Sequence, residues 1–259
     1  MIRANNQLTV HIMVRNEEFW IWFALAAALD GCDRLMLWDT GSEDRTLDIA
    51  QSVADNRLHV ERVAVSKSQR LCEVRNDMLD ATETDFFAIV DGDEVWPPSL
   101  WRQVEAHTRD PRCDAVVVPA CYPFPWLGAF HTEGKDDHEI ADVTGSYAAR
   151  VFRRAPGMRW RGEFGEDGLF SASGTELTRG SHNWMRVVSE PFWHMTLLPR
   201  SPLDDSTFWR QGKVQVDDAD AVVVGLIAYE EIPRVFTGSR PASVIDPFSH
   251  LHPSFSSTK

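Results

Sequence analysis

One stretch constrains the fold of this chain more than any other, an apolar run from Phe86 to Val90 that ends in Asp91-Gly92-Asp93-Glu94. The interior of a buried strand does not tolerate such charge, so we expect the acids at the carboxyl end of a strand, where open α/β sheets bind their ligands. Carboxylates this close repel one another unless a cation lies between them, which favours a divalent metal ion carrying a phosphate-bearing ligand. The alternative is a plain hairpin turn at Asp91-Gly92, which the prolines and the helix-like run from Pro97 to Val104 disfavour.

The first 120 residues alternate strand-like and helix-like segments, the pattern of βαβ units and of a mainly parallel sheet. Strands are predicted at residues 10–14, 35–38, 59–65, 86–90 and 115–118, and helices at residues 43–54 and 69–79. Asn16 suits the N-cap of a further helix. Because the carboxyl ends of parallel strands meet at one edge of a sheet, Arg15-Asn16-Glu17, Asp39 and Asp91-Gly92-Asp93 are expected to converge there.

Composition and charge disfavour several classes of protein. The formal charge of −13 argues against a broad nucleic-acid-binding face, which needs a basic stripe. The four cysteines form no CxxC pair and indicate reduced thiols, and the amino-terminal residues hold no apolar signal region, so a cytoplasmic protein is expected. The longest apolar stretch, Phe19 to Leu29, is too short to cross a bilayer. It predicts a core helix, with peripheral contact to a membrane surface as the alternative.

Four short motifs, in order along the chain, carry a resemblance to a known family. They are Val14-Arg15-Asn16-Glu17-Glu18, Trp38-Asp39-Thr40-Gly41-Ser42-Glu43-Asp44-Arg45-Thr46, Val74-Arg75-Asn76 and Val90-Asp91-Gly92-Asp93-Glu94. Their order and spacing resemble those of the family 2 glycosyltransferases with the GT-A fold. The resemblance covers residues 8 to about 100 well and continues weakly through residues 150–154 and 160–166. It implies an α/β fold of the Rossmann-like, nucleotide-diphospho-sugar transferase type, with a mainly parallel sheet flanked by helices and a smaller acceptor-side region.

The resemblance also implies a domain organisation. One GT-A catalytic domain would span residues 1–200, with a nucleotide-binding half at residues 1–119 and an acceptor-side half at residues 120–200. Residues 121–146 lack a clear period and carry a charged tract, which is typical of a functional loop or lid. Residues 201–259 would form a C-terminal extension packed on the same domain, with a mobile tail.

The activity implied is the transfer of a sugar, with inversion, from a UDP-, dTDP- or GDP-linked donor to an acceptor hydroxyl, with Mn²⁺ or Mg²⁺ as cofactor. The ion would neutralise the departing diphosphate. The residues implied for nucleotide-sugar binding are Arg15, Asn16, Glu17, Asp39, Arg75, Asp91 and Gly92. The residues implied for the metal are Asp91, Asp93 and His194. A histidine satisfied within the core is the alternative for His194, and Arg200 is a further candidate for the diphosphate.

The general base and the reaction class stay open at this stage. The terminal acid of the weakly matching segment is Glu166, with Asp167 beside it and Asp136 and Asp137 in reserve. Gly165 stands where relatives commonly have histidine, so a degenerate GT-A module that binds without catalysis is one alternative. A nucleotide-sugar hydrolase or a nucleotidyltransferase on the same fold is another. The acceptor is not indicated by any motif.

Overall fold

The computed structural model describes residues 6–63, 65, 71–123, 127–131, 137–163, 166–203 and 225–248. In these residues one large sheet runs in the order β14-β7-β6-β9-β4-β1-β2-β3, and further short strands pair with its members. The four strands β1 (Leu8–Val14), β2 (Arg34–Asp39), β3 (Leu58–Arg62) and β4 (Phe86–Ile89) are parallel to one another. The predicted α/β fold with a parallel sheet in the first part of the chain is therefore confirmed.

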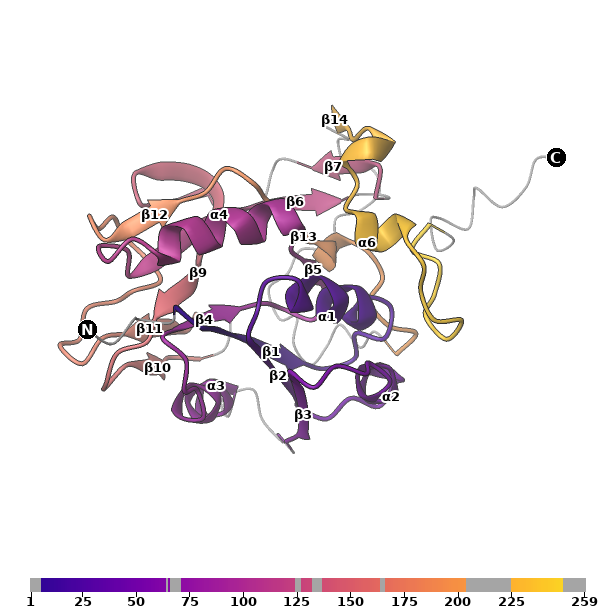
Figure 1. The fold of residues 1–259 in the computed structure, drawn as a ribbon, viewed down its shortest axis with the longest axis horizontal. Helices are drawn as coiled ribbons and strands as arrows, with labels where there is room; N and C mark the ends of the chain where they lie inside the picture. The colour runs from indigo at the N-terminus through magenta and orange to yellow at the C-terminus, as the bar shows by residue number, and fades with distance from the viewer. Residues whose placement is uncertain are drawn as a thin grey trace.

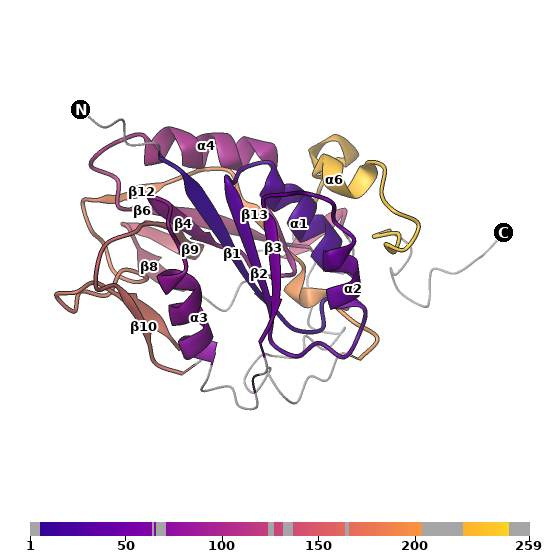
Figure 2. The same cartoon turned by 60° about the horizontal axis from the view of Figure 1, so that its bottom comes forward.

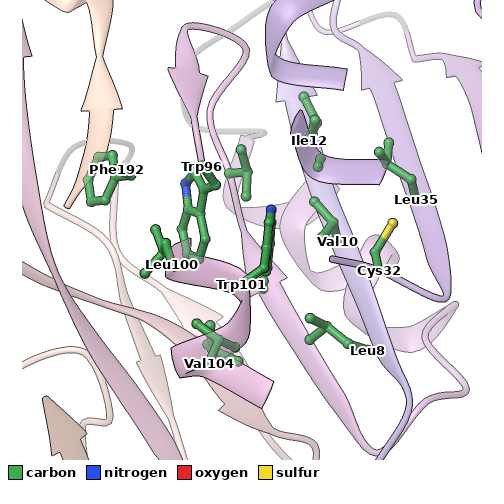
Figure 3. Packing of buried hydrophobic residues seen from close by; sticks show 14 of the residues in the cluster. Leu8, Val10, Ile12, Cys32, Leu35, Trp96, Leu100, Trp101, Val104 and Phe192 are labelled. Carbon is green, nitrogen blue, oxygen red and sulfur yellow. The ribbon is translucent and has the colours of Figure 1, made fainter. Parts of the chain in front are cut away.

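Helices cover both faces of the parallel part (Figures 1 and 2). Helices α1 (Ile21–Leu29), α2 (Thr46–Gln51) and α4 (Pro98–Thr108) lie over one face, and α3 (Leu71–Asp80) lies over the other. The core on the first face joins strand residues such as Val10 and Ile12 to Trp96, Leu100 and Trp101 at the start of α4 (Figure 3). Such a core fixes the crossover helices and leaves the carboxyl edge of the strands to the connecting turns.

The second half of the chain is mixed. Strand β9 (Val143–Arg153) is antiparallel both to β4 and to β6 (Ala115–Pro123), while β12 (Met185–Val187) and β13 (Phe192–His194) run parallel to β6. The short strand β5 (Glu94–Val95) pairs with β13. Downstream of His194, the 3₁₀ turn η2 (Met195–Leu197) continues the chain. Long-range pairing therefore brings residues near 94, 150 and 194 together.

Several predicted elements need correction. The segment at residues 121–146 was predicted to be irregular, yet it contains the end of β6, β7 (Ala129–His131), β8 (Asp137–Ile140) and the start of β9. Strands β10 (Arg159–Arg161) and β11 (Gly168–Phe170) form an antiparallel pair at the weakly matching segment. Asn16 is not a helix N-cap, because α1 begins at Ile21 and Asn16 adopts a left-handed backbone with φ of 52°. Its amide instead joins two loops, as described below.

The hairpin alternative for Asp91-Gly92 is wrong. Strand β5 follows the turn but pairs with β13, whereas β4 pairs with β1 and β9. The turn is closed by the Glu94 N–H, which donates to the Asp91 carbonyl at 3.0 Å. The acids consequently lie at a true strand end, as the metal interpretation requires.

The described part of residues 201–259 packs on the same body as α1. It contains β14 (Gly225–Leu226), the 3₁₀ turn η3 (Tyr229–Glu231) and the short helix α6 (Arg234–Thr237). Phe236 stands edge-on to Trp20, with ring centroids 6.2 Å apart, and contacts Phe23 on α1. The predicted core helix within residues 19–29 is confirmed, since Phe23 and Leu25 are fully buried. Among the described residues every helix is too short or too polar to span a bilayer. The four cysteines are free thiols, three of them buried.

Candidate functional site

The candidate site lies where the strand order reverses. Strand β1 has β2 on one side and β4 on the other, so the carboxyl ends of β1 and β4 flank a topological switch point, the usual ligand crevice of such sheets. Gly92, in the turn after β4, approaches the end of β1 closely. A Cβ at position 92 would lie 2.7 Å from Val14 Cγ2 and 3.1 Å from Glu17 Cγ. Only glycine at position 92 allows the turn Asp91–Glu94, called the acidic turn below, to lie this close to the loop after β1.

The loops after β1 and β2 form one hydrogen-bonded unit. The Asp39 carboxylate is buried, and its Oδ1 accepts from the Gly41 and Ser42 N–H groups at 2.8 and 2.9 Å. Its Oδ2 is also buried and has no hydrogen-bond partner within the described ranges. Asn16 donates its N–H to Ser42 Oγ at 2.9 Å and accepts from the Glu43 N–H at 2.8 Å. The two predicted donor-binding loops are thus brought together, with a buried carboxylate oxygen still able to accept a bond.

Arg15 lies at the outer end of this unit. Its guanidinium is 4.0 Å from Glu43, and one fifth of its side chain is exposed. Arg15 therefore lies on the solvent side of the loops after β1 and β2.

Asp93 is held in a buried cluster of charged groups. Its Oδ1 lies 3.4 Å from His194 Nε2, and its Oδ2 lies 3.7 Å from the Arg200 guanidinium. Arg200 also bonds Glu17 Oε1 at 2.5 Å, so the β1 loop, the acidic turn and the segment after η2 share one network. The sequence predicted these four residues separately, and the structure brings them together.

The Asp93 carboxylate affects the ionisation of His194. Burial lowers the pKa of His194, but the Asp93 carboxylate, first through its charge and then through a hydrogen bond, raises it, and the net pKa lies above the usual value. The imidazole therefore has an ionic partner and is not a histidine merely packed in the apolar core. A hard divalent cation beside Asp93 would replace the proton that this environment favours.

A second cluster joins Asp91, Glu94 and Arg150. One Arg150 amino group, Nη2, lies 2.5 Å from Glu94 Oε1 and 3.5 Å from Asp91 Oδ2. The other Glu94 oxygen accepts from Trp96 Nε1 at 3.2 Å. Burial raises the pKa of Glu94 to about 7, against the opposing effect of Arg150. Burial also raises the pKa of Asp91, but Arg150 outweighs it together with other cations, so the net pKa lies below the ordinary value and Asp91 is ionised.

The donor set fits a hard divalent ion. One ligand atom from each of Asp91, Glu94 and His194 lies within 4.8 Å of the other two. Two carboxylate oxygens and one imidazole nitrogen suit Mn²⁺ or Mg²⁺, with phosphate oxygens completing the shell. The sequence prediction chose Asp93 where this geometric cluster has Glu94. Asp93 nevertheless contacts the same histidine, whereas both Glu94 oxygens already accept hydrogen bonds.

Asp167 and Glu166 have opposite environments. The Asp167 side chain is 4% exposed and bonds the Arg75 guanidinium at 2.6 Å. Arg75 in turn stacks over Trp160, with its Cζ 4.7 Å from the ring centroid. Arg75 and Asp91 line the same narrow cavity. Asp167 is therefore connected through Arg75 to the cavity beside Asp91. Glu166 is exposed to solvent.

Some of the predicted candidate residues lie outside the described part of the chain, and the sequence did not point to His11. Asp136 and Gly165, together with the Asp137 side chain, lie outside the described residues. The sequence reading missed His11, whose ring lines the narrow cavity with Arg75 and bonds Thr82 Oγ1 at 2.7 Å. Burial, and then the Arg75 charge, lower the pKa of His11 to about 3, so the imidazole is neutral. A histidine among apolar residues of a predicted strand was the available signal.

Comparison with known proteins identifies the family. The model of the family "Glycosyl transferase family 2" matches residues 9–150, more than half of the 259 residues. The chain belongs to glycosyl transferase family 2. The matched range contains the loops after β1 and β2, the acidic turn and Arg150. This confirms the predicted family and makes the chain a glycosyltransferase domain.

Individual relatives are distant. A TPR repeat-containing protein of Synechococcus elongatus is 25% identical over 188 residues, which cover 73% of this chain and 41% of that protein. The crystal structure of S. aureus TarS 1-349 in complex with UDP-GlcNAc gives a TM-score of 0.54 at 14% identity, covering 80% of this chain and 62% of that one. The same TarS fragment in complex with UDP gives 0.53 at 14% identity, covering 73% and 60%. This likeness supports the fold, and the chain spans less than two thirds of each relative.

Proposed function

We propose that this chain is a metal-dependent inverting glycosyltransferase that moves a sugar from a nucleotide diphosphate sugar to an acceptor hydroxyl. The observation that carries the proposal is the contact of Asp93, in the turn after β4, with His194 and Arg200 at the switch point of the sheet. An anionic diphosphate bound there would meet a cation site and an arginine at once. TarS, which shares the fold, was crystallised with UDP and with UDP-GlcNAc, which supports a UDP-linked donor ahead of dTDP- or GDP-linked ones.

In this proposal the loops after β1 and β2 hold the nucleoside. The buried Asp39 Oδ2 would accept a hydrogen bond from the base, and Arg15, Asn16 and Glu17 would border the base and ribose. Arg75 would line the sugar side of the donor, and Asp91 and Gly92 the ribose and diphosphate side. Support comes from the shared hydrogen-bond unit of these loops and from the close approach of Gly92 to Val14.

Asp91, Asp93 and His194 would hold Mn²⁺ or Mg²⁺. When bound, the ion would act as a Lewis acid that neutralises charge developing on the diphosphate leaving group. Arg200 would add a second positive charge, and its contacts with Glu17 and Asp93 would hold the two carboxylates close to each other. Glu94 would anchor Arg150 and would not bind the ion, because both of its oxygens are engaged.

Asp167 is the better candidate for the general base. Inversion by single displacement needs one base on the face of the sugar opposite the diphosphate. Asp167 is buried, oriented by Arg75 and connected to the donor edge, whereas Glu166 is exposed. Arg75 would orient the carboxylate so that it can accept the proton of an acceptor hydroxyl.

Product analysis tests the reaction class. The protein is incubated with Mn²⁺ and UDP-, dTDP- or GDP-sugars, with and without candidate acceptors from lipid-linked sugars, polysaccharides, proteins and small metabolites. Acceptor-dependent release of nucleoside diphosphate with an inverted anomeric bond supports the proposal. Free sugar without acceptor dependence indicates a hydrolase, release of sugar 1-phosphate indicates nucleotidyl transfer, and tight binding without turnover indicates a binding module.

A further inference from the structure

The pairing of strand β9 gives Arg150 an unusual position. Val116 of β6 lies opposite Val151, but its neighbour Val117 lies opposite Ala149, so Arg150 is the extra residue of a β-bulge. On its other side β9 runs antiparallel to β4, where Ala88 pairs with Val151. Arg150 therefore lies beside the carboxyl end of β4, which is where the acidic turn begins. Bulges next to functional sites commonly redirect one side chain toward the site.

The redirected guanidinium is built into the acidic cluster. Its Nη2 contacts both Glu94 and Asp91, and its Cζ lies 5.2 Å from the ring centroid of Phe192 on β13. Glu94 is fully buried, and the Arg150 side chain is only 15% exposed. A guanidinium keeps its charge at any pH that a protein tolerates. Arg150 is thus a permanent cation within contact distance of a predicted metal ligand.

We propose that Arg150 is a positioning residue that acts as the resident cation of the acidic turn, so that the divalent ion enters the site as a unit with the diphosphate and not alone. This inference rests on the proposed function. A positive charge next to Asp91 disfavours a second cation through Coulomb repulsion in a site with little water. A diphosphate brings enough negative charge to offset that repulsion, so ion and nucleotide would strengthen each other's binding.

Binding of Mn²⁺, followed by electron paramagnetic resonance of the free ion, tests this without any turnover. Wild type is expected to bind Mn²⁺ weakly alone and much more tightly with UDP, GDP or dTDP, whichever nucleotide binds. R150M is expected to bind Mn²⁺ alone about tenfold or more tightly than wild type. The coupling between Mn²⁺ and nucleotide, which is reciprocal by linkage, should shrink by a similar factor. R150K, which keeps the charge, should stay near wild type.

Three further variants keep the test decisive. R150M leaves Glu94 buried without its cation and risks misfolding. The double variant E94Q/R150M is therefore compared with E94Q. These two proteins differ only at position 150. The double variant should bind Mn²⁺ alone more tightly than E94Q. R34M, which breaks the exposed Arg34–Glu83 pair of 2.6 Å at the opposite edge of the sheet, should change nothing.

The outcomes separate the two proposals. If wild type binds Mn²⁺ with nucleotide but removal of Arg150 leaves Mn²⁺ binding alone unchanged or weaker in both backgrounds, the role of Arg150 is refuted and the proposed function stands. If wild type binds no Mn²⁺ together with any of the three nucleotides, the proposed function fails and this inference fails with it.

Discussion

The two halves of the site are built in different ways. Residues 8–90 supply the loops after β1 and β2, where Arg15, Asn16, Glu17 and Asp39 lie at the ends of parallel strands, and Arg75 on α3. Residues 115–200 supply Arg150, Asp167, His194 and Arg200 from a bulge, a hairpin, a short strand and the segment after a 3₁₀ turn. In the proposed function, the first half forms the nucleotide-binding edge from residues at strand ends. The second half would supply cations and a base through long-range pairing, so the proposed chemistry depends on where the halves meet.

The acidic turn at that junction should show the largest effect. Asp93→Asn keeps the shape of the side chain but removes a charge that both His194 and Arg200 contact. Transfer should fall by about 10³-fold or more, since metal-assisted charge neutralisation supplies several kcal/mol. The midpoint of thermal unfolding should also fall, because His194 and Arg200 lose the charge of the buried Asp93. Glu83→Gln, at an exposed surface pair, is the control, and near-normal transfer by Asp93→Asn would remove the metal assignment.

The second comparison sets Asp167 against Glu166 within the acceptor-side half. Asp167→Asn should lower kcat by about 100-fold or more, because it removes a positioned base. Glu166→Gln should stay within about threefold of wild type, because its side chain is exposed. The reverse pattern would assign the base to Glu166.

His194 tests whether the second half contributes to the metal. His194→Gln should weaken Mn²⁺ binding in the presence of nucleotide by about tenfold or more, as even outer-shell partners of metal sites cost that much. His182→Gln is a matched control, because this ring stacks on Trp184 with centroids 4.5 Å apart, outside the site. Equal Mn²⁺ affinities for the two variants would leave His194 as a core residue.

The smallest effect is expected at His11, which lies within strand β1. Burial lowers the pKa of His11 to about 3 from 6.5 when folded. Because the folded state binds this proton more weakly than the unfolded chain does, the stabilisation is complete above pH 6.5 and is lost as the pH falls toward 3. The free energy of unfolding should fall by about 2 kcal/mol more between pH 7 and pH 5 in wild type than in His11→Gln. Urea unfolding at both pH values measures this, and His59→Gln, exposed on β3, should behave as wild type.

The same contrast explains what the sequence could predict. Asp39, Asp91 and Asp93 follow apolar runs directly, so their convergence followed from the rule that parallel strands end at one edge. Arg150 gave no comparable signal, because its role depends on a bulge between β6 and β9 and on the antiparallel pairing of β9 with β4. The preference for Asp167 over Glu166 likewise needed the structure, in which the Asp167 side chain is buried against Arg75 while Glu166 is exposed.

Anomalous diffraction at the manganese edge, from crystals grown with Mn²⁺ and the nucleotide that binds best, would locate the ion. We expect one strong peak in bonding contact with Asp93, His194 and the diphosphate oxygens, next to the Arg150 guanidinium. An ordered diphosphate in the crevice between β1 and β4, with no manganese peak beside Asp93, would refute the proposed metal site.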